Sequence, residues 1–318
     1  MQPSSAPPII SCILPTYNGA KYLQQALDAI SSQDLQNFEV LIVDDCSTDE
    51  TPAIAQSHCH RDSRFRVIRN SRNIKLPASL NVGFREAQGH YWTWTSDDNF
   101  HQPNAFRILS ETLDQRSEVG LVYTDQILVD EFGQVTQHAR ALASGMLVFG
   151  NTVGASFLYR KAVAEVTGEY DENLFLAEDF DYWLRISQTS LIARLHEPIY
   201  NYRFHSGSLT SKRQLDIAIA HERALLKNIG NLNWLKPCGK ARVYRDLAFR
   251  ALSQNRFNDF FASFLKAVFL KSSIFLSKNM LQELFAPNVC EEFDEKDKAD
   301  LDWTIHNRWK LQNLIFKK

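Results

Sequence analysis

The sequence predicts an α/β fold in which helices flank a mostly parallel sheet, followed by a helical C-terminal region. Two observations predict this arrangement. Short runs rich in β-branched and aromatic residues alternate with helical hydrophobic patterns up to about Ser211, which is typical of βαβ units. Strand signals then fade, and helical spacing continues to the end of the chain. We therefore expect two domains, residues 1–211 and residues 212–318.

Each predicted strand is a short apolar run bounded by turn residues. The run FEVLIV, for example, contains no polar side chain between Glu39 and Asp44, as expected for a strand that is buried on both faces. In chain order, the expected strands are residues 9–14, 38–43, 65–69, 90–95, 119–124, 154–159 and 199–204.

The helices predicted between and after these strands have recognisable ends. Ser47 and Glu50 have the spacing of a capping box for the helix that follows them. Gly89 ends one predicted helix, and Pro103 suits the first turn of the next. The expected helices are residues 19–33, a helix after 50, 77–88, a helix from 103, 161–167, 180–188, 214–228, 238–254, 257–277 and 299–316.

Two segments of the C-terminal region, residues 243–253 and 257–270, resemble a helical hairpin. Residues 257–269 carry apolar side chains along one helical face, and Lys266 and Lys271 lie beside it. Such a face packs against a neighbouring helix, which we favour, or docks on a membrane surface.

Composition argues against several classes of protein. Lys and Arg number 35 against 37 Asp and Glu, so no net positive charge attracts nucleic acid. The 5 cysteines are scattered without a C-x-x-C pair, which argues against a disulfide framework or a structural zinc site and fits a reducing compartment. Neither a signal peptide nor a membrane-spanning helix is predicted. We therefore expect a cytoplasmic protein.

Polar residues follow three of the predicted strands, at the sheet edge where open α/β folds bind ligands. Residues 15–18 (PTYN) follow the first strand, Asp44 and Asp45 the second, and Asp97 and Asp98 the fourth. Each pair of acids, taken alone, is also ordinary turn chemistry. Four carboxylates on one edge repel one another unless a cation or a proton is shared among them. A site of this kind suits Mg²⁺ or Mn²⁺.

Four motifs in this order resemble a known family. They are ILPTYNG at 13–19, LIVDDCSTDE at 41–50, TSDDN at 95–99 and AEDFDYWLR at 177–185. Over about residues 8–210, the chain resembles the inverting, nucleotide-sugar-dependent glycosyltransferases of family 2. The resemblance implies the GT-A fold, a Rossmann-like and mostly parallel sheet. It also implies hexosyl transfer with inversion from a nucleotide donor, which we expect to be UDP-linked, to an acceptor hydroxyl.

The resemblance implies roles at the donor site. The Tyr17 ring lies against the nucleobase, and the Asp45 carboxylate hydrogen-bonds the edge of the base. Asp97 holds the ribose, and Asp44 is an anchor near it. The donor-binding residues so implied are Pro15, Thr16, Tyr17, Asn18, Asp44, Asp45 and Asp97.

The resemblance also implies the groups that perform the reaction. Asp98 ligates the Mn²⁺ or Mg²⁺ that bridges the diphosphate, and His205 completes the metal site. Asp179 is the general base that takes the proton of the acceptor hydroxyl. Glu178 supports it by raising its proton affinity. These two acids also suit the first turn of a helix, and both interpretations can hold together. Arg203 either reaches a phosphate or lies at the surface, and we expect the surface position.

The chain departs from the family pattern at three positions. Cys46 stands where glycine is usual, so a positive φ would strain it. Thr95 replaces the first acid of the commonest D-x-D-D form, which leaves metal binding to Asp98 and His205. Lys75 lies in a segment that usually contains glycine.

The expected function is therefore that of a metal-dependent inverting glycosyltransferase in polysaccharide, cell-wall, glycolipid or glycoconjugate biosynthesis. Its partners would be a nucleotide-sugar donor and a saccharide or lipid-linked acceptor, with peripheral contact of the C-terminal helices at the inner face of the membrane. One alternative is a nucleotidyltransferase, although residues 15–21 lack the Gly-rich basic signature of those enzymes. Another is a non-catalytic descendant that binds a nucleotide-sugar, against which the intact Asp45, Asp98 and Asp179 argue.

Overall fold

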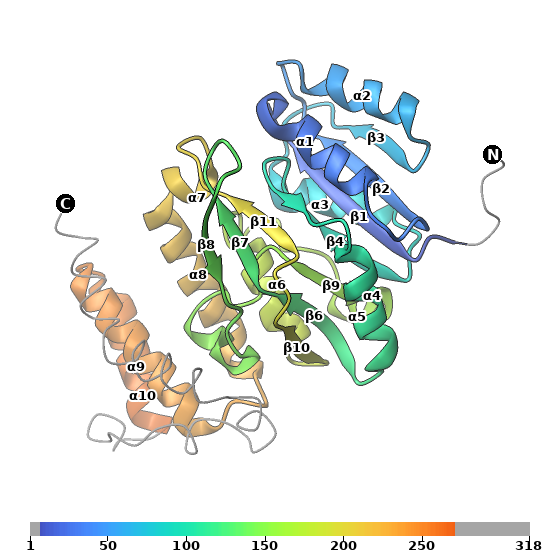
Figure 1. Ribbon diagram of the computed structural model, residues 1–318. Coiled ribbons are helices and arrows are strands. Elements are labelled where there is room, and N and C mark those ends of the chain that lie inside the picture. The colour runs from blue at the N-terminus through green and yellow to red at the C-terminus, as the bar shows by residue number, and fades with distance from the viewer. Residues whose placement is uncertain (1–6, 271–318) are drawn as a thin grey trace. The chain divides into compact units, whose positions relative to one another are not determined.

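The computed structural model describes residues 7–270, which form two compact units (Figure 1). The sheet unit contains residues 7–141 and 153–225, and the helical unit contains residues 142–152 and 226–270. The division falls within helix α8 (Gln214–Asn228). The predicted domain boundary at Ser211 stays a prediction.

The sheet unit is built on seven strands in the order β10-β6-β9-β4-β1-β2-β3. Strands β4, β1, β2 and β3 are parallel neighbours, whereas β9 runs antiparallel to both β4 and β6. Because β10 pairs in parallel with β6, all strands except β9 end at one edge. The strands are β1 (Ile10–Thr16), β2 (Phe38–Asp44), β3 (Phe65–Arg69), β4 (Tyr91–Trp94), β6 (Val119–Thr124), β9 (Phe157–Arg160) and β10 (Leu191–Leu195).

Helices cover both faces of this sheet, because β1 is apolar on both sides. Ile10 and Leu14 belong to a core cluster with Leu27 of α1 and Phe106 of α4. Ile13 points to the other face, where a Cβ added to Gly83 of α3 would lie 2.5 Å from its Cγ2 atom. The helices are α1 (Ala20–Ser31), α2 (Thr51–Arg61), α3 (Leu76–Arg85), α4 (Ala105–Gln115), α5 (Lys161–Thr167) and α6 (Glu178–Ile186).

A second, four-stranded sheet has the order β5-β11-β7-β8. Its strands are β5 (Phe100–His101), β11 (Tyr200–Arg203), β7 (Gln126–Val129) and β8 (Val135–Ala139), and α7 (Leu209–Lys212) follows β11. Only β11 lies within a predicted strand. The strand β8 reads VTQHA and is largely exposed, so it lacks the apolar alternation that identifies a strand.

The predicted capping box at 47–50 is wrong. The Ser47 hydroxyl accepts a hydrogen bond from the backbone N–H of Asn18, and Glu50, the residue before α2, makes no side-chain cap. The Asp49 carboxylate instead accepts from the N–H of Thr51 at 3.0 Å. The Ser47 side chain therefore joins the ends of β1 and β2 and does not cap α2.

In the helical unit, α9 (Pro237–Ser253) and α10 (Phe257–Leu270) pack against each other, which confirms the predicted hairpin. Two 3₁₀ turns, η1 (Ser144–Phe149) and η2 (Ile229–Asn231), complete the unit. Residues 271–277 of the predicted third C-terminal helix, with Lys271, and the predicted helix 299–316 lie outside the described residues. No helix within residues 7–270 is long and apolar enough to cross a membrane.

The apolar face of α10 divides into two parts. Phe260 and Phe264 are half-buried, and Ser263 and Ala267 are buried. Four large side chains are exposed at intervals of four residues, with Phe269 the most exposed at 91%. They are Phe257, Phe261, Leu265 and Phe269.

Candidate functional site

The carboxyl ends of β1 and β4 meet in a tight contact. The Thr16 hydroxyl donates a hydrogen bond to Oδ2 of Asp97, and the N–H of Asp45 donates to the carbonyl of Thr16 at 2.9 Å. A Cβ atom on Gly19 would lie 1.9 Å from Oδ2 of Asp97. Glycine is therefore required at the start of α1 for Asp97 to approach it.

Asp44 organises the loop after β2. Its side chain is fully buried, and Oδ1 accepts from the N–H of Ser47 at 2.9 Å. The Nε atom of Arg69 lies 3.4 Å from Oδ2. A buried carboxylate held by a backbone donor and a cation is suited to anchoring the loop.

Asp45 holds the segment between β3 and α3. Its Oδ1 atom accepts from Nδ2 of Asn70 at 2.9 Å and from the N–H of Ile74 at 2.8 Å. Its Oδ2 atom accepts from the N–H of Lys75 at 2.8 Å. Since Asp45 is buried, these bonds fix the wall of the sheet edge.

The other residues predicted after β1 differ in exposure. Pro15 is buried within β1, in register with Val43. Tyr17 is 51% exposed, so its ring is accessible. Asn18 has a φ of 54°, and its Oδ1 atom accepts from the N–H of Thr48 at 2.9 Å.

The pKa of Asp97 is raised to about 7, by desolvation first and then by the charge of Asp98, while the hydrogen bond from Thr16 opposes the shift. Asp97 therefore holds a proton for much of the time near neutral pH.

Asp98 is joined to the end of β11. Its Oδ2 atom lies 2.9 Å from Nε2 of His205, and both side chains are mostly buried. Its Oδ1 atom is buried without a hydrogen-bond partner within residues 7–270. A carboxylate with one free oxygen beside an imidazole matches the donor set of a divalent cation that also takes phosphate oxygens. Within the same residues, no group of three or more His, Cys, Asp or Glu side chains could hold a metal.

The expectation that Arg203 lies at the surface is wrong. The side chain is only 2% exposed, and Nε donates to the backbone carbonyl of Asp98 at 2.9 Å. Its remaining nitrogens donate to the carbonyls of Asp130 and Glu131 and to Oε1 of Gln25. The guanidinium thus ties the end of β4 to α1 and to the turn after β7.

Glu178 and Asp179 begin helix α6. Glu178 is buried, and burial followed by the charge of Asp179 raises the pKa of Glu178 to about 8. Its Oε2 atom accepts from the N–H of Leu176 at 2.7 Å. Oδ1 of Asp179 accepts from the N–H of Phe180 at 2.6 Å. Glu178 is therefore largely neutral at pH 7.

Tyr202 of β11 is a partly buried tyrosine whose hydroxyl lies 3.1 Å from Oγ1 of Thr210. Burial raises the pKa of Tyr202, its hydrogen bond with Thr210 opposes that shift, and the charges of Asp98 and Asp179 raise the pKa further. The Tyr202 hydroxyl therefore keeps its proton at neutral pH.

Backbone strain is concentrated at this edge. Of the five non-glycine residues with positive φ in the described part of the chain, four adjoin the predicted acids. Cys46, at the usual glycine position of the D-D-C-S motif, has a φ of 66°. Such strain gathers at functional sites more than elsewhere. The four residues are Asn18, Cys46, Lys75 and Leu176.

Sequence reasoning missed Asn70, Tyr202 and the buried role of Arg203. In the YRFH segment only the histidine has an obvious ligand chemistry, and no local pattern shows that an arginine is buried. Thr95 stands where the family pattern has an acid. Its Oγ1 atom lies 2.7 Å from the hydroxyl of the buried Tyr200.

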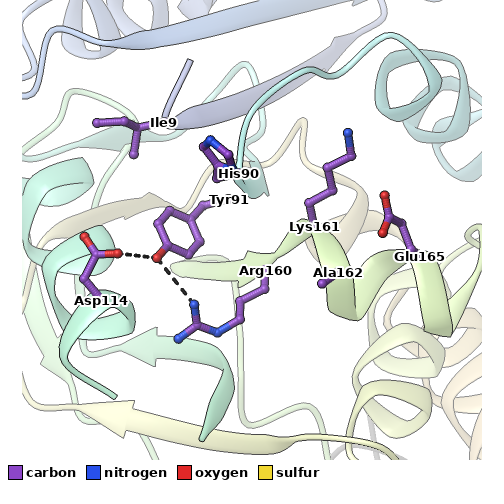
Figure 2. A pocket seen from close by; sticks show the side chains of 8 residues that line it. All are labelled: Ile9, His90, Tyr91, Asp114, Arg160, Lys161, Ala162 and Glu165. Atoms are coloured by element: carbon purple, nitrogen blue, oxygen red, sulfur yellow. Dashed lines mark hydrogen bonds between the residues drawn. The ribbon is translucent and has the colours of Figure 1, made fainter. Parts of the chain in front are cut away.

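A hollow at the opposite edge of the sheet carries polar groups that serve the fold (Figure 2). There Arg160 donates to the carbonyls of Val119 and Leu113, and the hydroxyl of Tyr91 donates to Asp114. These bonds close the end of α4.

Comparisons with known proteins bear on the fold and the family. The model of the family described as Glycosyl transferase family 2 matches residues 11–168. An uncharacterised glycosyltransferase of Rickettsia typhi is 26% identical over 225 residues, which are 66% of this chain and 69% of that protein. Chondroitin synthase of Escherichia coli is 26% identical over 218 residues, covering 66% of this chain and 31% of the synthase. This chain therefore spans about a third of the synthase.

Among solved structures, residues 1–349 of S. aureus TarS in complex with UDP-GlcNAc have a TM-score of 0.62 at 20% identity, covering 81% of this chain and 79% of that chain. The mannosyltransferase PcManGT of Pyrobaculum calidifontis, in complex with GDP-Man and Mn²⁺, has a TM-score of 0.52 at 15% identity, covering 87% and 77%. The chain thus has the fold of the GT-A glycosyltransferases and, over residues 11–168, matches glycosyl transferase family 2.

Proposed function

We propose that this protein is an inverting family 2 glycosyltransferase that moves a sugar from a UDP-sugar to an acceptor hydroxyl. The observation that carries the proposal is the meeting of β1, β2, β4 and β11 at one edge, where Thr16 bonds Asp97 and His205 bonds Asp98. Sheet edges of this kind bind nucleotides. The UDP-GlcNAc bound by TarS, which has the same fold, supports a UDP-linked donor.

The donor site in this proposal is formed by the loops that Asp44 and Asp45 hold. The exposed ring of Tyr17 stacks on the base, and the Asp45 carboxylate accepts a hydrogen bond from the edge of the base. Oδ2 of Asp45 already accepts from the N–H of Lys75, and a carboxylate oxygen has a second lone pair for that purpose. Asp97 accepts a hydrogen bond from a ribose hydroxyl, and Asp44 stabilises the loop after β2.

The metal site in this proposal consists of Asp98 and His205. The buried free Oδ1 of Asp98 fits a divalent cation, and the Mn²⁺ of the PcManGT complex supports this choice. When bound, Mn²⁺ or Mg²⁺ neutralises the charge that develops on the leaving diphosphate. Arg203 keeps the Asp98 backbone in place for this contact.

The acceptor hydroxyl loses its proton to Asp179. Its oxygen forms a bond to the anomeric carbon while the bond from that carbon to the diphosphate breaks, so the nucleotide leaves with the electron pair and the configuration inverts. Because Glu178 is neutral at pH 7, it adds no second negative charge beside Asp179. Its carboxyl group also accepts the hydrogen bond that holds the strained Leu176 in place.

The acceptor in this proposal is a saccharide or lipid-linked molecule of polysaccharide or glycoconjugate biosynthesis. The exposed apolar side chains of α10 suit contact with the headgroup region of a membrane, where a lipid-linked acceptor would be found.

The test measures UDP release from a panel of UDP-sugars in Mn²⁺, with pyrophosphate release from nucleoside triphosphates in parallel. We expect UDP release, and loss of it in Asp98→Ala. Pyrophosphate release would favour nucleotidyl transfer. UDP-sugar binding without turnover in the presence of a broad acceptor panel would favour the non-catalytic alternative.

A further inference from the structure

Lys75 has a backbone conformation that residues with a side chain almost never adopt. Its φ of 74° and ψ of 166° lie in a region occupied essentially by glycine alone. Its N–H donates to Oδ2 of Asp45 at 2.8 Å, and its carbonyl accepts from the N–H of Ser79 at 3.0 Å, so both sides of the residue are fixed. A side chain that is kept at such a position points to a use for that side chain.

The ammonium group of Lys75 is available to a ligand. The side chain is exposed, and within the described part of the chain its ammonium group makes no hydrogen bond or ion pair. Because the N–H of Lys75 contacts the Asp45 carboxylate, the side chain leaves the backbone beside that carboxylate. Of the other cations in this segment, Arg69 donates to the carbonyl of Ser47 at 2.9 Å, whereas Arg72 is exposed.

The Asp45 carboxylate can accept one more hydrogen bond, at its Oδ2 atom. Oδ1 accepts from Nδ2 of Asn70 at 2.9 Å and from the N–H of Ile74 at 2.8 Å, which occupies both of its lone pairs. Within the described residues Oδ2 accepts from the N–H of Lys75 alone, so its second lone pair is free. Oδ2 and the Lys75 ammonium group therefore offer a ligand one acceptor with a cationic donor beside it.

Among the nucleobases, uracil presents the complement of this pair. Its N3–H group lies between two carbonyl oxygens, so one acceptor and one adjacent donor satisfy the N–H and a carbonyl together. Guanine presents two neighbouring N–H donors, and a carboxylate with a single free lone pair leaves one of them unpaired, which is costly. Cytosine has no hydrogen at N3 and would meet Oδ2 of Asp45 with a lone pair.

The sheet order places Lys75 at the base end of the proposed donor site. The strands lie in the order β4-β1-β2-β3, so β1 and β2 separate the end of β3 from the end of β4. Lys75 follows β3, whereas Asp98, which binds the cation and hence the diphosphate in the proposed function, follows β4. A base held at Asp45, after β2, is therefore the part of the donor that lies beside Lys75.

We propose that Lys75 determines the specificity for uracil: its ammonium group donates to a carbonyl oxygen of the base while Oδ2 of Asp45 accepts from N3–H. The inference rests on the proposed function, in which Asp45 contacts the base. It identifies the residue that favours UDP over CDP and GDP, and it gives a reason for a lysine at a position that glycine would occupy without strain.

The experiment measures nucleotide affinities of the full-length protein and its variants. Calorimetry with Mn²⁺ gives the affinities for UDP, CDP and GDP, and ligand-observed NMR gives the affinity for uridine, which has no phosphate groups. Lys75→Met removes the charge but keeps an unbranched side chain at the strained position, and Lys75→Arg restores a cation. Arg72→Met is the matched control for the loss of a neighbouring exposed charge. Thermal unfolding shows that each variant is folded.

We expect Lys75→Met to weaken UDP and uridine binding by the same factor, about tenfold, and CDP and GDP binding by less than about twofold. Lys75→Arg and Arg72→Met should keep the preference for UDP. Unchanged UDP affinity in Lys75→Met, an equal loss for all three diphosphates, or a loss for UDP without one for uridine would each overturn the inference. If the unmutated protein binds none of the three diphosphates, the proposed function itself fails.

Discussion

Asp97 and Glu178 show how single carboxyl groups at this site differ from their exposed counterparts. Glu178 is buried and Asp97 is partly buried, each beside another acid, and the pKa of Asp97 is raised to about 7 and that of Glu178 to about 8, mainly by desolvation. A carboxyl whose folded pKa is raised binds a proton in the folded state that the unfolded state has lost. Each therefore stabilises the fold most at low pH, and this stabilisation disappears as the pH rises through the raised pKa.

Glu178→Gln should make stability less dependent on pH. In the unmutated protein, Glu178 lowers the free energy of unfolding by up to about 1.4 kcal/mol per pH unit between its unfolded pKa and about pH 8. Glutamine cannot ionise but can still accept from the N–H of Leu176. Urea unfolding from pH 5 to 8 checks this, with the exposed Glu165→Gln as control. An identical pH slope in Glu178→Gln and the unmutated protein would contradict the shifted pKa.

Asp179→Asn separates chemistry from binding. Asparagine keeps the size of the side chain but cannot take the acceptor's proton, so turnover should fall about 10²–10⁴-fold. UDP affinity should change little, because the proposed role of Asp179 does not involve the nucleotide. Steady-state kinetics with calorimetry tests both statements, and Glu178→Gln should lose less turnover. Near-normal turnover in Asp179→Asn would place the base elsewhere.

Lys75 carries strain that a glycine would not. Its φ of 74° is unfavourable for any side chain, and the N–H that Asp45 accepts from is retained in glycine. Lys75→Gly should therefore raise the free energy of unfolding by about 0.5–1 kcal/mol, whereas Lys75→Ala should not. Thermal unfolding of the two variants checks this. A lower melting temperature for Lys75→Gly than for Lys75→Ala would show that glycine's greater freedom in the unfolded chain outweighs the relief of strain.

At the level of helices and strands, the site is held by side chains that cross from one strand end to the next. Asp45 joins β2 to the segment before α3, and Ser47 joins the end of β2 to the end of β1. Arg203 joins β11 to β4, α1 and the turn after β7. The main sheet and the smaller sheet are thus connected at the position where Asp98 meets His205.

Arg203→Lys should weaken this connection. A lysine cannot reproduce the several directed bonds of a buried guanidinium, so we expect a loss of about 2–4 kcal/mol in the free energy of unfolding. The exposed Arg107→Lys, whose partners Asp34 and Glu111 are also exposed, should lose less than about 1 kcal/mol. Urea unfolding compares the two. Equal small losses would show that the buried arginine contributes no more than a surface ion pair.

Across the chain as a whole, six of the seven strands of the main sheet were predicted and β10 was missed, whereas β11 was the one strand of the smaller sheet that was predicted. Buried runs such as FEVLIV have an unmistakable composition, and parallel strands bring their ends to one edge, so Asp44, Asp45, Asp97 and Asp98 could be placed together. The strands β7 and β8 have no such pattern, because β8 is exposed and both depend on pairing with distant segments. The burial of Arg203 depends on four elements at once, which no local spacing records.

The proposed function depends above all on the strand ends binding a nucleoside diphosphate through a cation held by Asp98 and His205. Calorimetric titration of UDP into the unmutated protein, Asp98→Ala and Asp97→Asn, each with and without Mn²⁺, tests this binding. We expect Mn²⁺ to strengthen UDP binding in the unmutated protein, Asp98→Ala to abolish this effect while remaining folded, and Asp97→Asn largely to retain it. UDP binding that is equally strong with and without Mn²⁺ in both the unmutated protein and Asp98→Ala would contradict the proposed cation site.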